Sequence, residues 1–288
     1  MDIKKVCVVG AGTMGNGIAQ IVAQAGYETA MIDVKQEYLD RGLNAIKGSL
    51  ARVVKKGTMT QDDADKVLAR IKPYTDMKAA AANADYVIEA VFEKAEVKQP
   101  VLKLLDEICP EKTIIASNTS SIPISLLSAV TKRPQKVVGL HFFNPVPVMK
   151  LIEVVKSLTV SEETINVSVA FGKSLGKEPV VVKDSPGFIA NRIANLAANE
   201  ALKILEEGLA SAEDIDKVCR LAFNWPMGLL QMVDLVGADV VMDLGESIYK
   251  ETGWDRYKPA PILKRMVESG YLGNKANKGV YTLFGPKQ

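Results

Sequence analysis

Residues 6–15 of this chain read VCVVGAGTMG, a short apolar run followed by a glycine-rich turn. Gly10, Gly12 and Gly15 have the G-x-G-x-x-G spacing, between a predicted strand and a predicted helix that continues to Gly26. In that context Gly10 permits a tight turn, Gly12 lets the backbone approach a pyrophosphate, and Gly15 lets the helix pack closely on the strand. The helix N-terminus would then face the phosphates. We therefore expect a dinucleotide here; a glycine-rich turn without a ligand is the alternative.

Asp33 lies near the end of the second predicted strand, residues 29–34. A carboxylate at about this distance from the glycines, roughly 20 residues, accepts hydrogen bonds from the adenosine ribose and repels a 2′-phosphate. Val34 rather than an arginine follows Asp33, which favours NAD over NADP, although Lys35 weakens that preference. The alternative is that Asp33 only caps the following helix.

The first half of the chain alternates strand-like and helix-like segments. Further strand candidates are residues 85–91, 113–117 and 136–141. Apolar strands that alternate with helices predict a mainly parallel sheet covered on both faces. Right-handed crossovers then give a doubly wound, Rossmann-type α/β fold. Apolar residues at helical spacing predict one long amphipathic helix over residues 36–57.

The pattern becomes helical after residues 184–187, which read DSPG. The expected helical segments are residues 188–207, a helix capped by Ser211, an apolar stretch at 229–248, and a last helix after Pro259 and Pro261. We predict an NAD-binding Rossmann-type domain over residues 1–185 and an all-helical substrate and dimerisation domain over 186–288. Strongly apolar helices in so small a domain predict a homodimer.

The composition is that of a soluble globular protein. Of 288 residues, 48% are hydrophobic and 24% charged, and a net charge of +2 gives no general reason to expect nucleic acid or an anionic membrane. We see no signal peptide and no apolar segment of about 20 residues, so we expect a cytoplasmic protein. Cys7, Cys109 and Cys219 are odd in number and far apart, which argues against a disulfide framework or a zinc site, and we expect no metal.

His141 is the one histidine of the chain and lies in the peptide GLHFFNP, residues 139–145. Imidazole readily accepts and donates protons near neutrality, so His141 is a candidate acid/base. The alternative is a hydrogen-bonded structural residue at the end of a strand. Glu153 lies within the apolar run 151–155. A carboxylate in such a run needs a partner, either the far nitrogen of His141 or, from an edge strand, solvent.

Four peptides carry a specific resemblance. They are residues 116–121, ASNTSS; 141–145, HFFNP; 149–154, MKLIEV; and 184–192, DSPGFIANR. With them the whole chain resembles the (S)-3-hydroxyacyl-CoA dehydrogenase family, in particular its short bacterial 3-hydroxybutyryl-CoA dehydrogenases. The resemblance implies oxidation of a 3-hydroxyacyl-CoA to a 3-ketoacyl-CoA with NAD, or the reverse reaction.

Matched motif by motif, the family's catalytic residues fall on Ser120, His141, Glu153 and Asn191. Hydride transfer from a secondary alcohol requires removal of the hydroxyl proton, which His141 can take and, in the reducing direction, return. The resemblance implies that Ser120 holds the substrate oxygen and that Asn191 contacts substrate. Without it, Ser120 is equally an ordinary loop or N-cap residue, and Asn191 a helix-interface hydrogen bond.

The resemblance also implies binding residues. Ser49 and Lys56, with Asn118 and Ser120, match positions that contact the coenzyme A thioester. The implied NAD contacts are Gly10, Ala11, Gly12, Thr13, Met14, Gly15, Asp33, Glu93, Lys98, Asn118 and Lys275. Ser49 and Lys56 share a helix face by their spacing, and a cation there could meet a CoA phosphate. A solvated basic face explains Lys56 equally well.

Two other functions remain open from the residues. One is a dehydrogenase of a free β-hydroxy acid, although the families compared use a lysine as the central catalytic group. The other is a dinucleotide-binding protein without turnover, which needs Gly10, Gly12, Gly15 and Asp33 but no acid/base set.

Overall fold

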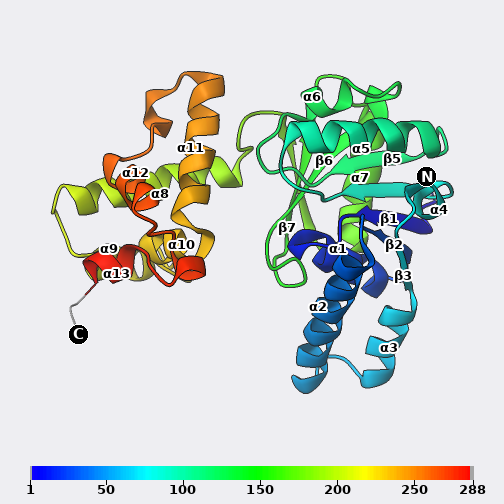
Figure 1. The fold of residues 1–288 in the computed structure, drawn as a ribbon, viewed down its shortest axis with the longest axis horizontal. Coiled ribbons are helices and arrows are strands. Elements are labelled where there is room, and N and C mark those ends of the chain that lie inside the picture. The colour runs from blue at the N-terminus through cyan, green and yellow to red at the C-terminus, as the bar shows by residue number, and fades with distance from the viewer. Residues whose placement is uncertain (1, 286–288) are drawn as a thin grey trace. The chain divides into compact units, whose positions relative to one another are not determined.

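The computed structural model describes residues 2–285. The chain divides between Ser185 and Pro186 into two compact units. Figure 1 shows the first unit, coloured blue to green, as a sheet with helices packed on it, and the second unit as helices alone. None of the described helices combines the length and the apolar character that a membrane span needs.

The first unit is built on an eight-stranded sheet of order β3-β2-β1-β4-β5-β6-β7-β8. The strands are β1 (Lys5–Val9), β2 (Glu28–Ile32), β3 (Ile71–Tyr74), β4 (Tyr86–Glu89), β5 (Ile114–Ser117), β6 (Val137–Phe142), β7 (Leu151–Lys156) and β8 (Glu178–Lys183). Neighbours from β3 to β6 are parallel, whereas β7 is antiparallel to β6 and parallel to β8. The predicted Rossmann-type, mainly parallel sheet is confirmed, with the strand order reversing between β1 and β4.

The edge strands β3 and β8 are absent from the sequence-based prediction. In β3 two of four residues are exposed, and in β8 only one residue is buried. Edge strands bury little side chain, so they lack the continuous apolar run that marks the inner strands of a parallel sheet. The three valines of β8 are nonetheless a recognisable β-strand signal.

Seven α-helices belong to the described part of the first unit. They are α1 (Thr13–Gln24), α2 (Gln36–Lys55), α3 (Gln61–Ala69), α4 (Met77–Ala81), α5 (Ala95–Ile108), α6 (Ile124–Ser128) and α7 (Glu162–Ser174). The predicted long amphipathic helix is confirmed as α2. Its apolar residues Leu39, Ile46 and Leu50 are buried, while its other side carries charged residues. In Figure 1, α2 and α3 lie side by side and extend away from the sheet.

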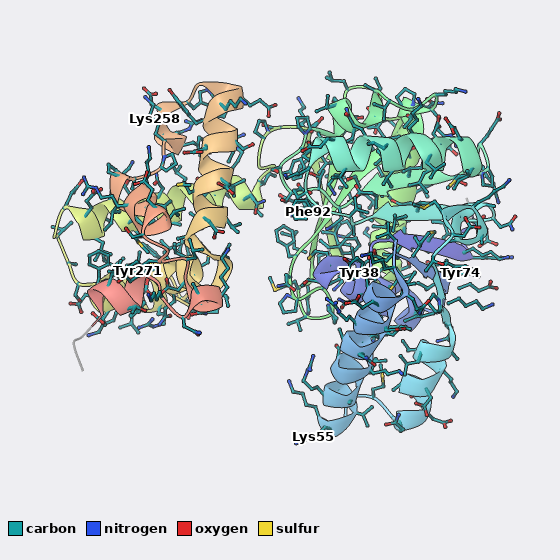
Figure 2. The ribbon with its side chains drawn as sticks, viewed as in Figure 1. Tyr38, Lys55, Tyr74, Phe92, Lys258 and Tyr271 are labelled. Carbon is teal, nitrogen blue, oxygen red and sulfur yellow. The ribbon has the colours of Figure 1, made fainter. Side chains whose placement is uncertain are left out.

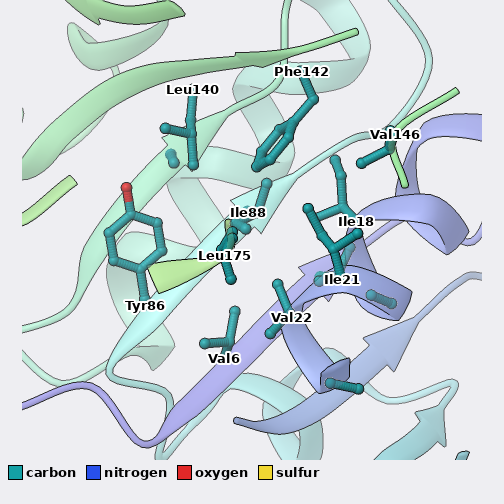
Figure 3. Close-up of a cluster of buried hydrophobic side chains, with 14 of the residues drawn as sticks. Val6, Ile18, Ile21, Val22, Tyr86, Ile88, Leu140, Phe142, Val146 and Leu175 are labelled. Atoms are coloured by element: carbon teal, nitrogen blue, oxygen red, sulfur yellow. The ribbon is translucent and has the colours of Figure 1, made fainter. Parts of the chain in front are cut away.

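The core of this unit clamps α1 onto the sheet. Figure 3 shows Ile18, Ile21 and Val22 of α1 facing side chains of β1, β4 and β6. Each such large apolar side chain contributes about 1.5–3 kcal/mol when it leaves water. On the same face of the sheet, the Tyr86 ring stacks on Phe171 of α7, with ring centroids 4.5 Å apart. This packing fixes the start of α1 at the carboxyl end of β1.

The second unit is all-helical in its described residues, as predicted. Its α-helices are α8 (Ala190–Glu206), α9 (Ala212–Ala222), α10 (Leu229–Val236), α11 (Ala238–Thr252), α12 (Pro261–Glu268) and α13 (Val280–Phe284). The predicted Ser211 cap is confirmed, since its Oγ accepts from the Asp214 amide at 3.2 Å. The helical stretch predicted at 229–248 is instead two helices. Gly237, at φ 110°, turns the chain between them. The prediction that the helix after Pro261 is the last one is wrong, because α13 follows it.

Asp85 contributes to the stability of the sheet in a way that depends on pH. Its Oδ2 accepts from the amides of Lys4 and Lys5, both at 3.0 Å, and its Oδ1 accepts from Lys112 Nζ at 2.7 Å. Burial raises the pKa of Asp85, but the Lys112 ammonium and the two amides lower it by a larger amount. The net pKa therefore lies below the ordinary value. Stability from such a carboxyl is present above its unfolded-state pKa and is lost as pH falls through its folded-state pKa.

We therefore expect Asp85→Asn to lower the free energy of unfolding by about 1.5–3 kcal/mol at pH 7, the scale of hydrogen bonds to a charged group. The difference from the parent protein should shrink as pH falls below 3.8. Urea unfolding at a series of pH values measures it. Asp62→Asn, at a side chain that is 88% exposed, is the control and should change little. A difference that stays constant into strong acid would contradict the assignment.

Candidate active site

The carboxyl ends of β1, β4, β5 and β6 meet at one edge of the sheet, because these strands are parallel. The segments that follow the first three of them are residues 10–15, 90–93 and 118–121. In doubly wound sheets, ligands bind outside the carboxyl ends, where the strand order reverses. The structure thus brings most of the predicted site residues of the first unit to this edge.

Each glycine of the turn has a different reason to lack a side chain. Gly10 has φ 105°, and a Cβ there would lie 2.6 Å from the Ala90 carbonyl oxygen. A Cβ on Gly15 would lie 1.8 Å from the Gly10 carbonyl oxygen. A Cβ on Gly12 would meet no described atom within 4 Å, so the chain's own packing does not require glycine there. Open space at Gly12 suits a ligand that approaches the backbone.

The first turn of α1 can receive an anion. Gly12 is the N-cap and offers no side chain to the first-turn amides, and that turn carries no acidic residue. Such amides, together with the helix dipole, favour phosphate oxygens. These features fit the pyrophosphate of a dinucleotide.

Asp33 joins the end of β2 to the glycine turn. Its Oδ2 accepts from the Ala11 amide at 2.8 Å and its Oδ1 from the Val34 amide at 2.7 Å. The N-cap of α2 is Lys35, so the alternative that Asp33 merely caps the next helix is wrong. The carboxylate is half-buried beside the turn, where it can meet a ribose.

Glu93 and Lys98, both predicted to contact the cofactor, contact each other, with Lys98 Nζ 3.2 Å from Glu93 Oε2. Lys98 Nζ also lies 2.7 Å from Glu89 Oε1, and the Lys98 side chain is only 1% exposed. Burial raises the pKa of Glu93, but the Lys98 charge and the hydrogen bonds from Thr119 and Ser120 lower it by more, so its net pKa is below the ordinary value.

Ser120 and Asn118 lie just after β5. Ser120 donates to Glu93 Oε1 through its amide at 2.7 Å and through its hydroxyl at 3.3 Å. The N-cap of α6 is Pro123, so the N-cap alternative for Ser120 is wrong. Asn118 Oδ1 accepts from the Phe142 amide at 2.9 Å. This bond ties the segment after β5 to the end of β6, beside His141.

His141 and Glu153 are directly opposite in the antiparallel ladder of β6 and β7. His141 Nδ1 lies 2.8 Å from Glu153 Oε2, and both side chains are buried. The alternative of a solvent-facing Glu153 on an edge strand is wrong, since β7 lies between β6 and β8. A carboxylate at Nδ1 favours the tautomer with a proton there, which leaves Nε2 as the proton-accepting nitrogen of the neutral ring.

Asn191 lies in the first turn of α8, in the second unit. The next two members of its polar row form helix-interface hydrogen bonds. Asn195 Nδ2 donates to the Val241 carbonyl oxygen at 2.7 Å, and Asn199 accepts from the Ala260 amide at 2.7 Å. These two amides brace α8 within its own unit, whereas Asn191 is only half-buried.

The remaining predicted contacts are spread over both units. Ser49 is half-buried on α2, and Lys56 is exposed at its C-cap. Figure 2 shows the neighbouring Lys55 at the end of α2. Lys275 lies in the second unit, in a 3-10 turn (Asn274–Ala276), where its Nζ is 2.6 Å from both carboxylate oxygens of Asp239. That ion pair gives Lys275 a structural partner of its own.

Sequence reasoning missed Lys177 and Glu89. Lys177 is buried and its Nζ donates to the carbonyl oxygens of Val146 and Met149, at 2.5 and 2.7 Å, in the loop that joins β6 to β7. Burial lowers the pKa of Lys177. A lysine after a glycine resembles any solvated turn, so no sequence signal marked it. Glu89 did carry a signal, because a carboxylate that ends a fully buried strand requires partners. No group of acidic, histidine and cysteine residues within 2–285 suits a metal ion.

Comparison with known proteins identifies relatives along nearly the whole chain. Residues 5–185 match the family described as 3-hydroxyacyl-CoA dehydrogenase, NAD binding domain, and residues 187–283 match its C-terminal domain. A probable 3-hydroxybutyryl-CoA dehydrogenase of Bacillus subtilis is 44% identical over 281 residues, which is 98% of each chain. A 3-hydroxyadipyl-CoA dehydrogenase of Escherichia coli is 40% identical and covers 98% of this chain, but only 59% of its own length is matched.

A solved structure shows the same similarity in three dimensions. The crystal structure of an (S)-3-hydroxybutyryl-CoA dehydrogenase from Ralstonia eutropha superimposes with a TM-score of 0.95 and 44% identity, over 99% of this chain and 100% of that one.

The position of Asp33 predicts the choice of cofactor. Asp33→Ser removes a carboxylate that repels a 2′-phosphate, so the ratio of kcat/KM with NADH to kcat/KM with NADPH should fall. Loss of the Ala11 hydrogen bond can weaken both cofactors, but it does not by itself move their ratio. Steady-state kinetics with each cofactor measure the change. An unmoved ratio would show that Asp33 only shapes the glycine turn.

Proposed function

Since this chain belongs to the 3-hydroxyacyl-CoA dehydrogenase family, we propose that it interconverts (S)-3-hydroxyacyl-CoA and 3-ketoacyl-CoA by NAD-dependent hydride transfer, with His141 as general acid/base. The names of its relatives support 3-hydroxybutyryl-CoA and acetoacetyl-CoA as the substrate pair. The observation that carries the proposal is the buried His141–Glu153 hydrogen bond at the carboxyl edge of the sheet.

In the proposed mechanism, bound NAD supplies the hydride acceptor. In the oxidative direction the proton of the 3-hydroxyl group passes to His141 Nε2. A hydride leaves carbon 3, which bears that hydroxyl group, and carbon 3 becomes the ketone carbon. Glu153 accepts a hydrogen bond from Nδ1–H and stabilises the imidazolium that forms. Reduction reverses both transfers, and His141 returns the proton to the developing alkoxide.

The other residues bind and orient. The hydroxyl of Ser120 holds the substrate oxygen, and Asn191 helps to position the substrate. The amides that follow Gly12 hold the pyrophosphate, and Asp33 holds the ribose. Asn118, Glu93, Lys98 and Lys275 complete the proposed cofactor contacts. Ser49 on α2 and Lys56 at the C-cap of that helix bind the coenzyme A portion.

We further propose a homodimer formed through the helical unit. The support is a set of large apolar side chains that are exposed there, among them Leu221 at 76%, Leu209 at 74% and Ile193 at 63%. Pairing two copies would remove such surface from water. We also propose a cytoplasmic location, because the three cysteines are buried free thiols, as is usual in a reducing compartment.

One assay separates this function from the two alternatives. NADH oxidation with acetoacetyl-CoA, but not with free acetoacetate, supports the CoA enzyme. Turnover of free acetoacetate alone would favour a β-hydroxy-acid dehydrogenase. Binding of NADH without turnover of either compound would favour a dinucleotide-binding protein.

We expect His141→Ala to lower kcat with acetoacetyl-CoA by about 10²–10⁴-fold, the usual contribution of a positioned acid/base. NADH affinity should be almost unchanged. The chain has no second histidine that could take over the role of His141. Glu153→Gln should lower kcat less, because an amide still accepts from Nδ1–H but carries no charge for the imidazolium. Kinetics and an NADH fluorescence titration measure both effects. Near-normal turnover by a folded His141→Ala protein would exclude this assignment.

Lys56→Ala tests the coenzyme A site. Contacts far from the reacting carbon can supply binding energy that positions the acyl group, so KM for acetoacetyl-CoA should rise. A truncated thioester that lacks the CoA nucleotide should react equally well with both proteins. Lys55→Ala, at the adjacent exposed lysine of the same helix end, is the matched control. Equal losses on both substrates would point to misfolding, and an unchanged KM would make Lys56 an ordinary solvated lysine.

A further inference from the structure

Lys98 has a buried ammonium group that lies between two carboxylates. Its Nζ is 2.7 Å from Glu89 Oε1 and 3.2 Å from Glu93 Oε2, and it donates to the Val91 carbonyl oxygen at 3.3 Å. The Glu89 side chain is fully buried and that of Glu93 is 35% exposed. Two carboxylates this close to one cation depend on it, because removing the cation would leave a buried, uncompensated charge.

Glu93 uses its other oxygen to hold the loop after β5. Glu93 Oε1 accepts from the Thr119 hydroxyl at 2.6 Å, from the Ser120 amide at 2.7 Å and from the Ser121 amide at 3.1 Å. The hydroxyls of Ser120 and Ser121 lie at 3.3 and 3.2 Å from the same oxygen. A single carboxylate thus joins Lys98 on one side to three consecutive loop residues on the other.

Glu89 anchors the same cation to the sheet. It ends β4, and its carboxylate also accepts from the Ser117 hydroxyl at 2.6 Å and from the Val91 amide at 2.7 Å. Ser117 is the last residue of β5. Lys98 on α5 is therefore fixed against the ends of two neighbouring strands, and Glu93 is in turn fixed by Lys98.

We propose that Lys98 is a positioning residue for Ser120, which acts by holding the Glu93 carboxylate against residues 119–121. The proposal rests on the function proposed above, because it takes from it the role of Ser120 in binding the substrate oxygen. This positioning role is additional to the cofactor contact that the resemblance implies for Lys98.

The protonation state of Glu93 explains why a cation is needed. An ionised carboxylate only accepts hydrogen bonds, so the Ser120 hydroxyl must be the donor in its bond to Glu93. When a substrate carbonyl oxygen binds, the hydroxyl proton turns from Glu93 to that oxygen, while the shorter bond from the Ser120 amide, at 2.7 Å, keeps Ser120 attached to Glu93. Without Lys98, Glu93 would be held less firmly or would take up a proton, and the loop would lose a common acceptor for its amides and hydroxyls.

A double-mutant cycle tests whether Lys98 acts through Ser120. The Lys98 variant is Glu89→Gln/Lys98→Met, which removes the cation together with its fully buried partner and leaves Glu93 in place. Three proteins are compared with the parent: the Lys98 variant, Ser120→Ala, and the combination of the two. The readouts are kcat and KM for acetoacetyl-CoA, the NADH dissociation constant, and the thermal midpoint. Lys103→Met, at an exposed lysine of the same helix, is the matched control and should match the parent protein.

We expect the Lys98 variant to lower kcat at saturating NADH about 10-fold, within the range of coupling between residues of one hydrogen-bond network. The NADH dissociation constant of each variant sets the saturating concentration. In the Ser120→Ala background the further loss of kcat should disappear. A full loss of kcat that persists in that background would overturn this inference and leave the proposed function standing. A normal kcat for Ser120→Ala alone would instead overturn the proposed role of Ser120, and this inference with it.

If the Lys98 variant does not fold, as its thermal midpoint would show, Glu93→Gln replaces it in the same cycle. Its amide removes the charge that Lys98 pairs with and weakens the acceptor that the loop shares. The same two results decide the inference. The kcat loss either disappears or persists when Ser120 is alanine.

Discussion

The arrangement of the site depends on the reversal of chain direction between β6 and β7. In the rest of the sheet from β3 to β6 the strands run parallel, so each side chain at the carboxyl edge comes from a separate crossover. The antiparallel β7 begins at the same edge, after the loop of residues 143–150, and places Glu153 opposite His141 in the ladder. Because side chains alternate between faces, a slip of one residue in this pairing would put the carboxylate on the opposite face of the sheet from the imidazole. Lys177 holds the loop that makes the reversal, and the Phe143 ring lies 4.4 Å from the His141 ring within it.

Carboxylates that gather several amides organise both units. Asp184 accepts from the first-turn amides of α6, Asp216 from those of α10, and Asp234 from those of α13. Each comes from a distant part of the chain, and each supplies a cap that the local sequence lacks. Glu93 does the same for the loop after β5, but its side chain is partly exposed at the sheet edge. The site therefore differs from these three helix caps in two respects. Its carboxylate is partly exposed, and an acid/base pair lies beside it.

Local patterns in the sequence predict much of this fold. Six residues with three glycines are enough to predict the turn between β1 and α1. The apolar residues of α2 likewise recur at helical spacing. Pairings between distant segments have no local signal. The contact of His141 with Glu153 depends on which strands become neighbours and in which register. The burial of Lys98 contradicts the usual preference of lysine for solvent, so a prediction from residue type alone places it on the surface. The break at Gly237 was likewise hidden within an apolar stretch whose periodicity continues across it.

The single imidazole of the chain can also serve as a spectroscopic probe. Because His141 is the only histidine of the chain, isotopic labelling of histidine nitrogen introduces signals from one ring alone, with no assignment step. The two ring nitrogens of a neutral imidazole differ in chemical shift according to which one carries the proton, so the tautomer imposed by Glu153 can be observed directly rather than assigned from hydrogen-bond geometry. Cofactor and thioester can then be added in turn to the labelled protein, and each change in the spectrum refers to a known atom.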